Sequence, residues 1–231
     1  MLTFVFMELI NKLKSIFNVE TSVQLTENKE YRFTINWIKA TKENPFHILF
    51  TSGLSNTKQL NSEKYSEFEY IELYFCLPEY WKVEDTSLDS QWPIEWLNRI
   101  AEVPQKNSTW FGPGDTIPAG NPTQEISSKF KQNHFILAEP IKLEERLKEV
   151  SLTDKSVRFL SVIPIFDTEM AHKSNHSAKI LMAKYLYANL TEELDEYRTP
   201  LIKNKKFNLF IIVVIGLSLA VGLTIVFRLF L

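Results

Sequence analysis

The sequence contains very little cysteine, since Cys76 is the only one among 231 residues. No disulfide can form within the chain, which excludes a disulfide-stabilised fold and suits a reducing compartment. Cys76 lies in the apolar run 71–77. We therefore expect it to be a small buried core residue and not a nucleophile.

The chain also lacks an excess of basic residues. Its 26 lysines and arginines stand against 28 acidic residues, which gives a net charge of −2. Proteins that bind nucleic acids usually carry a basic excess or stripe, so we expect no nucleic-acid partner. The nearest approach to a basic cluster is Lys203, Lys205 and Lys206, and these residues have a different explanation below.

Sequence motifs for enzyme chemistry are missing. There is no CxxC pair, no Ser-His-Asp order and no motif of paired acids. The loop 112–116 (Gly-Pro-Gly-Asp-Thr) has no lysine, which a phosphate-binding P-loop requires, and Pro113 has no amide to offer a phosphate. We therefore predict that the protein is not an enzyme and binds no cofactor.

One group of residues keeps a metal-dependent alternative open. Glu169, His172 and His176 lie at i, i+3 and i+7 of an expected helix, where they could share a metal ion. The pattern is not HExxH, because no glutamate follows the first histidine. Polar neighbours favour solvated histidines near a helix start, so we predict no metal site here.

A long apolar segment occupies the C-terminus. It begins at Phe207, ends at Phe227 and holds 21 residues without a charge. A helix of this length spans roughly 31 Å, close to the hydrocarbon core of about 30 Å. We therefore predict a transmembrane helix over residues 207–227.

The flanking charges predict the orientation of this span. Arg198, Lys203, Lys205 and Lys206 precede it, whereas only Arg228 follows. By the positive-inside rule, we expect a single-pass protein with its N-terminal domain in the cytoplasm. The sequence leaves the oligomeric state open.

The N-terminal residues predict a helix and not a secretory signal. The apolar stretch 2–7 is too short for a signal and has no basic residues before it. Residues 7–17 carry apolar side chains at helical spacing, which predicts an amphipathic helix packed on the domain, with a position on the membrane surface as the lesser alternative.

Five segments are predicted to be strands. They are short, rich in aromatic and branched residues, and bounded by turn residues. Their ranges are 34–40, 45–51, 68–77, 135–138 and 157–166. In the third segment, alternate residues from Ile71 to Leu77 are apolar, which marks the face directed at the core.

Two further helices are expected between and after these strands. The first covers residues 92–101, with Pro93 in its first turn and Pro104 blocking its continuation. The second covers residues 168–189. Its expected inner side consists of Ile180, Leu181, Tyr185 and Leu186. The intermixed strands and helices predict an α/β (α+β) class, a mixed β-sheet packed with helices.

Four segments occur together in an order that resembles the suppressor of fused domain, particularly its bacterial branch. They span residues 46–55, 70–81, 92–118 and 157–169 and include the stretches Phe-His-Ile-Leu-Phe-Thr-Ser-Gly-Leu-Ser and Thr-Trp-Phe-Gly-Pro-Gly-Asp-Thr-Ile-Pro. On this basis we divide the chain into an N-terminal helix and first strands (1–43), a suppressor of fused-like domain (44–190), a basic juxtamembrane linker (191–206) and the span (207–227).

The resemblance implies a protein-binding domain without known enzymatic chemistry. The animal member of the family sequesters a transcription factor between this domain and a second one. We expect no second domain after the last helix of this chain, so that interface cannot be assigned to this protein. The resemblance to bacterial members implies that this chain is an immunity protein, which neutralises a toxin. It also implies that the chain lies in the bacterial inner membrane. The candidate protein-binding residues are Trp92, Trp110, Phe111 and Asp115, an aromatic and charged mix typical of protein contact surfaces.

Three functions follow from these observations. The first is a membrane-anchored binding protein that neutralises a toxin stoichiometrically. The second is a membrane scaffold without a toxin partner. The third is a metal-dependent hydrolase that uses Glu169, His172 and His176.

Overall fold

The computed structural model describes residues 2–59 and 63–203. The helices are α1 (Leu2–Ile16), α2 (Leu88–Lys106), α3 (Glu144–Leu147), α4 (Asp167–Asn175) and α5 (Ala178–Tyr187), with short 3-10 turns η1 (Leu54–Asn56) and η2 (Glu63–Phe68). The strands are β1 (Val23–Asn28), β2 (Phe33–Ile38), β3 (Phe46–Ser52), β4 (Ile71–Pro78), β5 (Thr116–Pro118), β6 (His134–Ala138), β7 (Val150–Ser151) and β8 (Ser156–Ile165).

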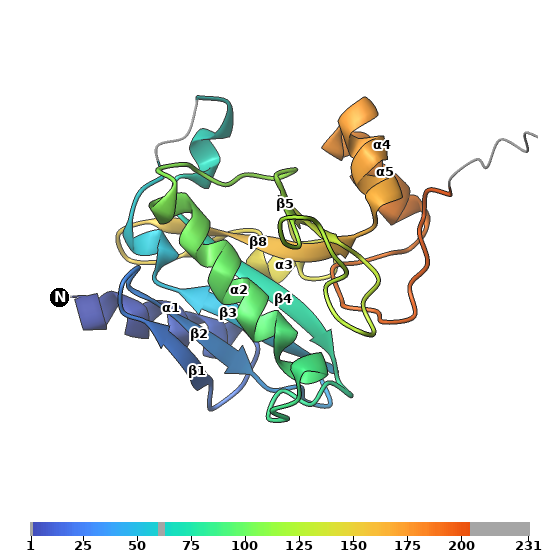
Figure 1. The fold of residues 1–231 in the computed structure, drawn as a ribbon. Helices are drawn as coiled ribbons and strands as arrows, with labels where there is room; N and C mark the ends of the chain where they lie inside the picture. The colour runs from blue at the N-terminus through green and yellow to red at the C-terminus, as the bar shows by residue number, and fades with distance from the viewer. Residues whose placement is uncertain (1, 60–62, 204–231) are drawn as a thin grey trace, which may run out of the picture. The chain divides into compact units, whose positions relative to one another are not determined.

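The strands form one mixed sheet in the order β1-β2-β3-β4-β8-β6-β5, with β7 paired to β8 beside this path. Only β4 and β8 pair in parallel; the other neighbours are antiparallel. In Figure 1, α2 crosses the sheet on the viewer's side, and α1 lies behind it. The sheet between helices confirms the predicted α+β class.

Helix α2 covers one face of the sheet. Its residues Leu97, Ile100 and Ala101 are buried at helical spacing, and the helix packs on β2, β3 and β4. Beside them lies an aromatic cluster, in which the Trp92 ring is 4.8 Å from Phe130 and 5.6 Å from Phe75. Tilted and edge-on aromatic pairs at these separations stabilise a core beyond the area that they bury.

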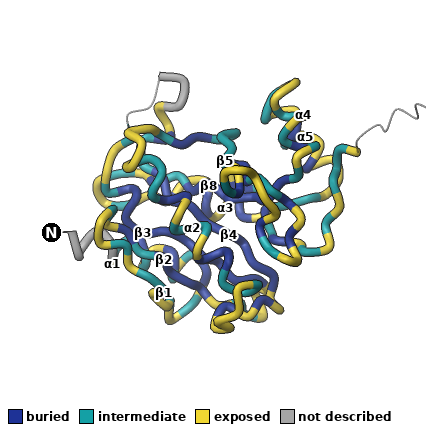
Figure 2. The backbone as a smooth tube through the Cα atoms, in the orientation of Figure 1, coloured by how far each residue is buried: buried dark blue, intermediate teal, exposed yellow. Residues whose placement is uncertain are grey.

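Helices α1, α3 and α5 cover the other face. Leu9, Leu13 and Phe17 of the N-terminal segment are buried in a cluster with β3, β4 and β8, which confirms the predicted packing of this helix on the domain. Leu181 and Tyr185 of α5 pack on β6 and β8. Figure 2 shows the inner strands of the sheet, such as β3, β4 and β8, as continuously buried stretches of the chain.

Strand β4 is buried on both faces. The alternate residues from Ile71 to Leu77 belong to the cluster under α2, as predicted, while Tyr74 and Cys76 belong to the cluster under α1. Cys76 is fully buried, which confirms its predicted place in the core, and burial raises the pKa of its thiol.

All five predicted strands are present with boundaries shifted by a few residues. The prediction missed β1 because its sequence, VQLTEN, is largely polar. This strand lies at the sheet edge, where its residues are mostly exposed or half-buried and need no apolar pattern.

The first predicted helix is wrong in its boundaries. Helix α2 begins at Leu88, before the predicted start, so Pro93 lies beyond its first turn, and it continues through Pro104 to Lys106. A proline in the last turn removes one hydrogen bond and crowds one carbonyl. The burial of Leu97 and Ile100 upstream offsets that cost.

The predicted helix over residues 168–189 is two helices. The chain leaves the α-helical region at His176, and the side chain of Ser177 accepts a hydrogen bond from the Ile180 amide at 3.2 Å, which starts α5. The predicted inner side is also partly wrong. Leu181 and Tyr185 are buried, but Ile180 and Leu186 are 43% and 58% exposed.

Residues Met1–Leu201 form one compact unit; the second unit, Ile202–Leu231, is described for only two residues. Within residues 2–59 and 63–203, no helix combines the length and apolar character that crossing a membrane needs. The predicted span 207–227 lies outside the described residues.

A buried glutamate attaches the segment after α5 to the domain. Glu192 is 1% exposed and accepts hydrogen bonds from the Tyr74 hydroxyl and from the amides of Ile141, Lys142 and Leu143, at 2.7 to 3.2 Å. These four donors replace the water that the carboxylate loses on burial. The segment predicted to be a linker is thus fixed to the domain from its first residues.

We expect Glu192→Ala to lower the free energy of unfolding by about 2–4 kcal/mol, because it leaves several buried donors without an acceptor. Urea unfolding followed by circular dichroism measures the loss. The neighbouring Glu193→Ala is the matched control: it removes a part-exposed ion pair with Lys142 and should cost less than about 1 kcal/mol. Equal losses in both variants would contradict this role of Glu192.

Candidate functional site

Two of the four predicted protein-binding residues lie in the core. Trp92 and Phe111 are each 4% exposed and belong to the cluster under α2. The indole nitrogen of Trp92 is buried and has no hydrogen-bond partner among the described residues. Neither side chain offers surface to a partner in this conformation.

The other two predicted residues, Trp110 and Asp115, are half-buried in the loop between α2 and β5. The Asp115 carboxylate accepts a hydrogen bond from the Gly112 amide at 2.8 Å. The backbone carbonyl of Asp115 accepts another from the Leu137 amide, also at 2.8 Å. The Asp115 side chain thus bonds back to its own loop. Its contact with a partner stays a prediction.

Glycine at position 114 is required by the packing of this loop. Gly114 has φ of +95°, and a Cβ there would lie 2.6 Å from the Cβ of Ala178. The loop therefore approaches the start of α5 more closely than any other residue would allow.

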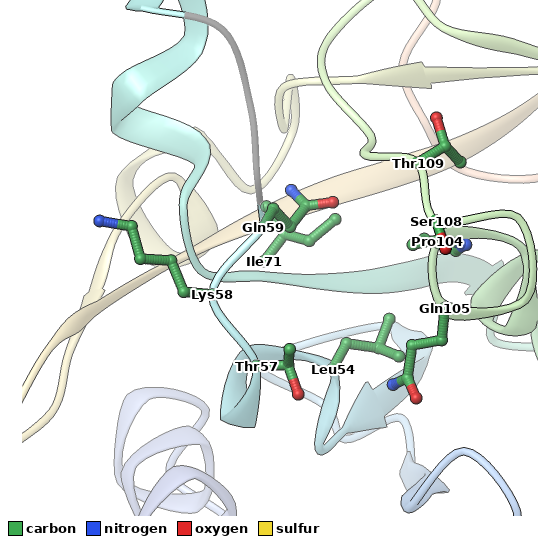
Figure 3. Close-up of a pocket in the computed structure, with 9 residues that line it drawn as sticks. All are labelled: Leu54, Thr57, Lys58, Gln59, Ile71, Pro104, Gln105, Ser108 and Thr109. Atoms are coloured by element: carbon green, nitrogen blue, oxygen red, sulfur yellow. The ribbon is translucent and has the colours of Figure 1, made fainter.

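A surface hollow of about 220 Å³ opens beside this loop. It lies between the η1 segment, the start of β4 and the end of α2, as Figure 3 shows. The residues that line it are Leu54, Thr57, Lys58, Gln59, Ile71, Pro104, Gln105, Ser108 and Thr109.

Gln59 connects two walls of the hollow. Its side-chain amide accepts a hydrogen bond from the Phe111 amide at 2.8 Å and donates to the Phe111 carbonyl at 3.1 Å. The same amide donates to the Phe68 carbonyl at 2.8 Å. A glutamine used in this way imitates a strand pair and holds the Trp110 loop against the η1 segment.

A second buried glutamate fixes the η1 wall. Glu72 of β4 is fully buried and accepts hydrogen bonds from the Gly53 and Ser55 amides and from the Thr51 and Ser55 hydroxyls, at 2.6 to 3.0 Å. Burial raises the pKa of Glu72 in spite of these donors. The carboxyl holds the sharp turn that carries Leu54 to the edge of the hollow.

The hollow combines an apolar floor with a polar rim. Leu54, Ile71 and Pro104 supply apolar surface, while Thr57 and Thr109 are among the exposed polar residues around it. Such a hollow suits one apolar side chain of a protein partner, with hydrogen bonds at the margin. None of these groups has the arrangement of a nucleophile and its base.

Sequence reasoning missed this hollow. It predicted no strand or helix between residues 51 and 68 and gave Gln59 and Glu72 no role. A buried glutamate in an otherwise apolar strand was the one available signal. Its partners in the 51–55 segment cannot be read from spacing, because the β3–β4 register brings them together.

The three residues of the metal-dependent alternative are not arranged as a metal site. Glu169 is fully buried, and its oxygens accept hydrogen bonds from Arg198 at 2.5 and 2.9 Å, from the amides of Phe166 and Leu201, and from the Tyr185 hydroxyl. Burial acts to raise the pKa of Glu169, but Arg198 and these donors outweigh it and lower the pKa.

The two histidines stack on one another and not around a common ion position. Their ring centroids are 4.2 Å apart and the ring planes make an angle of 28°. Partial burial, with the charges of His176 and Lys184, lowers the pKa of His172. In the part of the chain that the structure describes, no group of three or more histidine, cysteine or acidic side chains could hold a metal ion.

The chain thus forms a mixed α+β domain with a surface hollow beside the Trp110 loop. Residues 29–199 match the family model described as suppressor of fused protein (SUFU). The chain therefore belongs to the suppressor of fused family, which confirms the resemblance seen in the sequence. No curated protein matches the chain.

Solved structures share this fold. A suppressor of fused homologue from Neisseria gonorrhoeae FA 1090 is 17% identical with a TM-score of 0.65, and the match covers 87% of this chain and 99% of that one. A chain of a Sufu-Fu complex is 15% identical with a TM-score of 0.61, over 85% and 92%. Drosophila Suppressor of Fused is 15% identical with a TM-score of 0.59, over 93% of this chain and 54% of its own length.

We expect Arg198→Met to lower the free energy of unfolding at neutral pH by about 3–5 kcal/mol, because it leaves a buried carboxylate without its cation. Arg99→Met is the matched control, since Arg99 pairs with Glu95 at 3.8 Å on the surface of α2. It should cost less than about 1 kcal/mol.

The stability that Arg198→Met loses relative to the native chain should become smaller as the pH falls. The native pair holds the pKa of Glu169 below its ordinary 4.5, so its stabilisation is present above that pH and is lost as the pH falls through the lowered pKa. In Arg198→Met the pKa of Glu169 rises. Protonation at low pH then removes the buried, unpaired charge that destabilises the variant. Urea titrations at several pH values should show the deficit shrinking on acidification. A deficit that stays constant would contradict the assignment.

Proposed function

We propose that the protein is a membrane-anchored binding protein that neutralises a toxin by covering the toxin's working surface. The observation that carries the binding part is the hollow beside the Trp110 loop, which has an apolar floor and walls fixed by Gln59 and Glu72. Walls that are already ordered reduce the entropy lost when a partner binds. Binding is stoichiometric and requires no chemical step.

Family membership supports a binding protein over an enzyme. One relative of the same fold was crystallised as a Sufu-Fu complex, that is, with another protein. The toxin as partner comes from the resemblance to bacterial members. A scaffold that recruits proteins to a membrane is the second candidate, and it shares the same hollow.

The hydrolase is disfavoured by the environment of Glu169. Its carboxylate is fully buried and already takes donors from Arg198, Tyr185 and two backbone amides. A metal ion there would have to displace Arg198.

The membrane anchor is proposed from the sequence of residues 207–227, which is long enough to span the hydrocarbon core and follows Lys203, Lys205 and Lys206. The domain then lies on the cytoplasmic side. An anchor would hold the binding surface at the membrane, where a toxin that acts on or crosses it must pass.

We expect the double variant Thr57→Trp, Thr109→Trp to weaken partner binding at least about tenfold, since two indoles on the rim would fill the hollow. The full chain would be co-expressed with the candidate toxin encoded beside its gene, and growth and co-purification measured. The matched control is Thr123→Trp, which places one indole on an exposed loop residue outside the hollow.

Protection by the native chain and the control, lost in the double variant, is the result we expect. Equal protection by all three chains would exclude the hollow as the binding surface. A stable partner without any effect on growth would favour the scaffold.

We also expect the full chain to stay in the membrane pellet after alkaline extraction. Lysines at Val213 and Leu219 should release it, because each charge near the centre of a span costs about 2.5–3.5 kcal/mol. The same two-lysine change at the exposed Leu88 and Tyr80 should leave extraction unchanged. Release of the native chain would contradict the anchor.

A further inference from the structure

Helix α5 exposes apolar side chains to solvent. Only Leu181 and Tyr185 are buried, whereas Ile180, Leu186 and Tyr187 are 43%, 58% and 93% exposed. A surface helix of a globular domain normally places polar residues on its outer side. Three large apolar or aromatic side chains on one ten-residue helix point to a surface that another phase or molecule covers.

The same region carries only positive charge. No aspartate or glutamate occurs from Met170 to Leu190, although the whole chain has a net charge of −2. Lys179 and Lys184 are exposed on α5, and neither makes an ion pair within the described part of the chain. The exposed face is therefore apolar and basic together.

Acidic side chains near this face are few. Glu139 and Glu144 line a second hollow, of about 580 Å³, whose α5 side includes Lys179, Met182 and Leu186. Glu144 is paired with Lys148 at 2.9 Å. The negative charge on that flank is thus partly compensated by Lys148 and Lys179, and Lys184 is not among the residues that line the hollow.

The C-terminal segment of the domain ends on the elements that carry α5. Leu201 packs against the cluster that buries Leu181 and Tyr185, and the Arg198 guanidinium lies 5.3 Å from the Tyr185 ring. Phe207, the first residue of the proposed span, follows Leu201 by six positions. A chain of six residues reaches roughly 20 Å at most.

We propose that the outer face of α5 docks on the anionic surface of the membrane in which the chain is anchored. Ile180, Leu186 and Tyr187 enter the interface between headgroups and acyl chains, while Lys179 and Lys184 contact anionic headgroups. This combination of apolar insertion and basic charge is the pattern of interfacial helices, and tyrosine favours that depth. The inference rests on the proposed anchor, and the docking orients the domain with respect to the bilayer.

The test uses the full chain in vesicles, with Tyr187→Cys carrying an environment-sensitive fluorophore. The native Cys76 is fully buried, so the label attaches at the introduced position. Leu88→Cys, which is 81% exposed on α2, is the matched control. Emission is compared in vesicles of phosphatidylcholine alone and of phosphatidylcholine mixed with phosphatidylglycerol, after alkaline washing has established that the chain is inserted.

We expect a blue shift and a rise in emission at position 187 in the anionic vesicles, with no change at position 88. Lys179→Glu together with Lys184→Glu should abolish the shift, while the charge reversal Lys106→Glu on α2 should not. A water-like signal at position 187 in washed anionic vesicles overturns the docking and leaves the anchor intact. Shielding that depends on protein concentration and not on lipid charge also overturns it, in favour of self-association. Loss of the chain on washing refutes the anchor, and the docking proposal with it.

Discussion

The buried pair of Glu169 and Arg198 is the interaction on which the C-terminal half of the domain depends. It joins the first turn of α4, the end of β8 through the Pro164 carbonyl and the segment that follows α5. Tyr185 of α5 completes the group through its hydroxyl. A buried charge pair is tolerated only when its hydrogen-bonding capacity is satisfied, and here both carboxylate oxygens are occupied. One ion pair therefore helps to fix both the position of helix α5 and the path of the chain after it.

Two further buried glutamates, like Glu169, have carboxylate oxygens that accept hydrogen bonds from the surrounding chain. Glu72 fixes the turn after β3, and Glu192 fixes the segment after α5 on the start of α3, each by accepting several backbone or hydroxyl donors. Each carboxyl orders irregular chain that apolar packing alone would leave without a single conformation. The result is a frame with ordered loops, and a binding surface built on ordered elements is more precise than one built on loops alone.

Much of the fold could be predicted from the sequence, because apolar patterns report burial directly. Cys76 and the inner residues of β4 were placed correctly on that ground. The polar edge strand β1 and the break at His176 were missed, since an edge strand needs no apolar face and a single capping serine ends a helical pattern. The candidate site was less predictable. Residue type suggested Trp92 and Phe111 as contacts, but large aromatic residues fill cores as readily as interfaces.

The central claim is that a partner protein binds at the hollow between the η1 segment and the end of α2. Hydrogen exchange of the full chain, alone and in complex with its partner, tests this most directly. Binding should slow exchange in residues 54–59 and 104–111 and leave the β1 edge unchanged. Protection confined to other segments, with exchange at the hollow unaltered in a stable complex, would contradict the account.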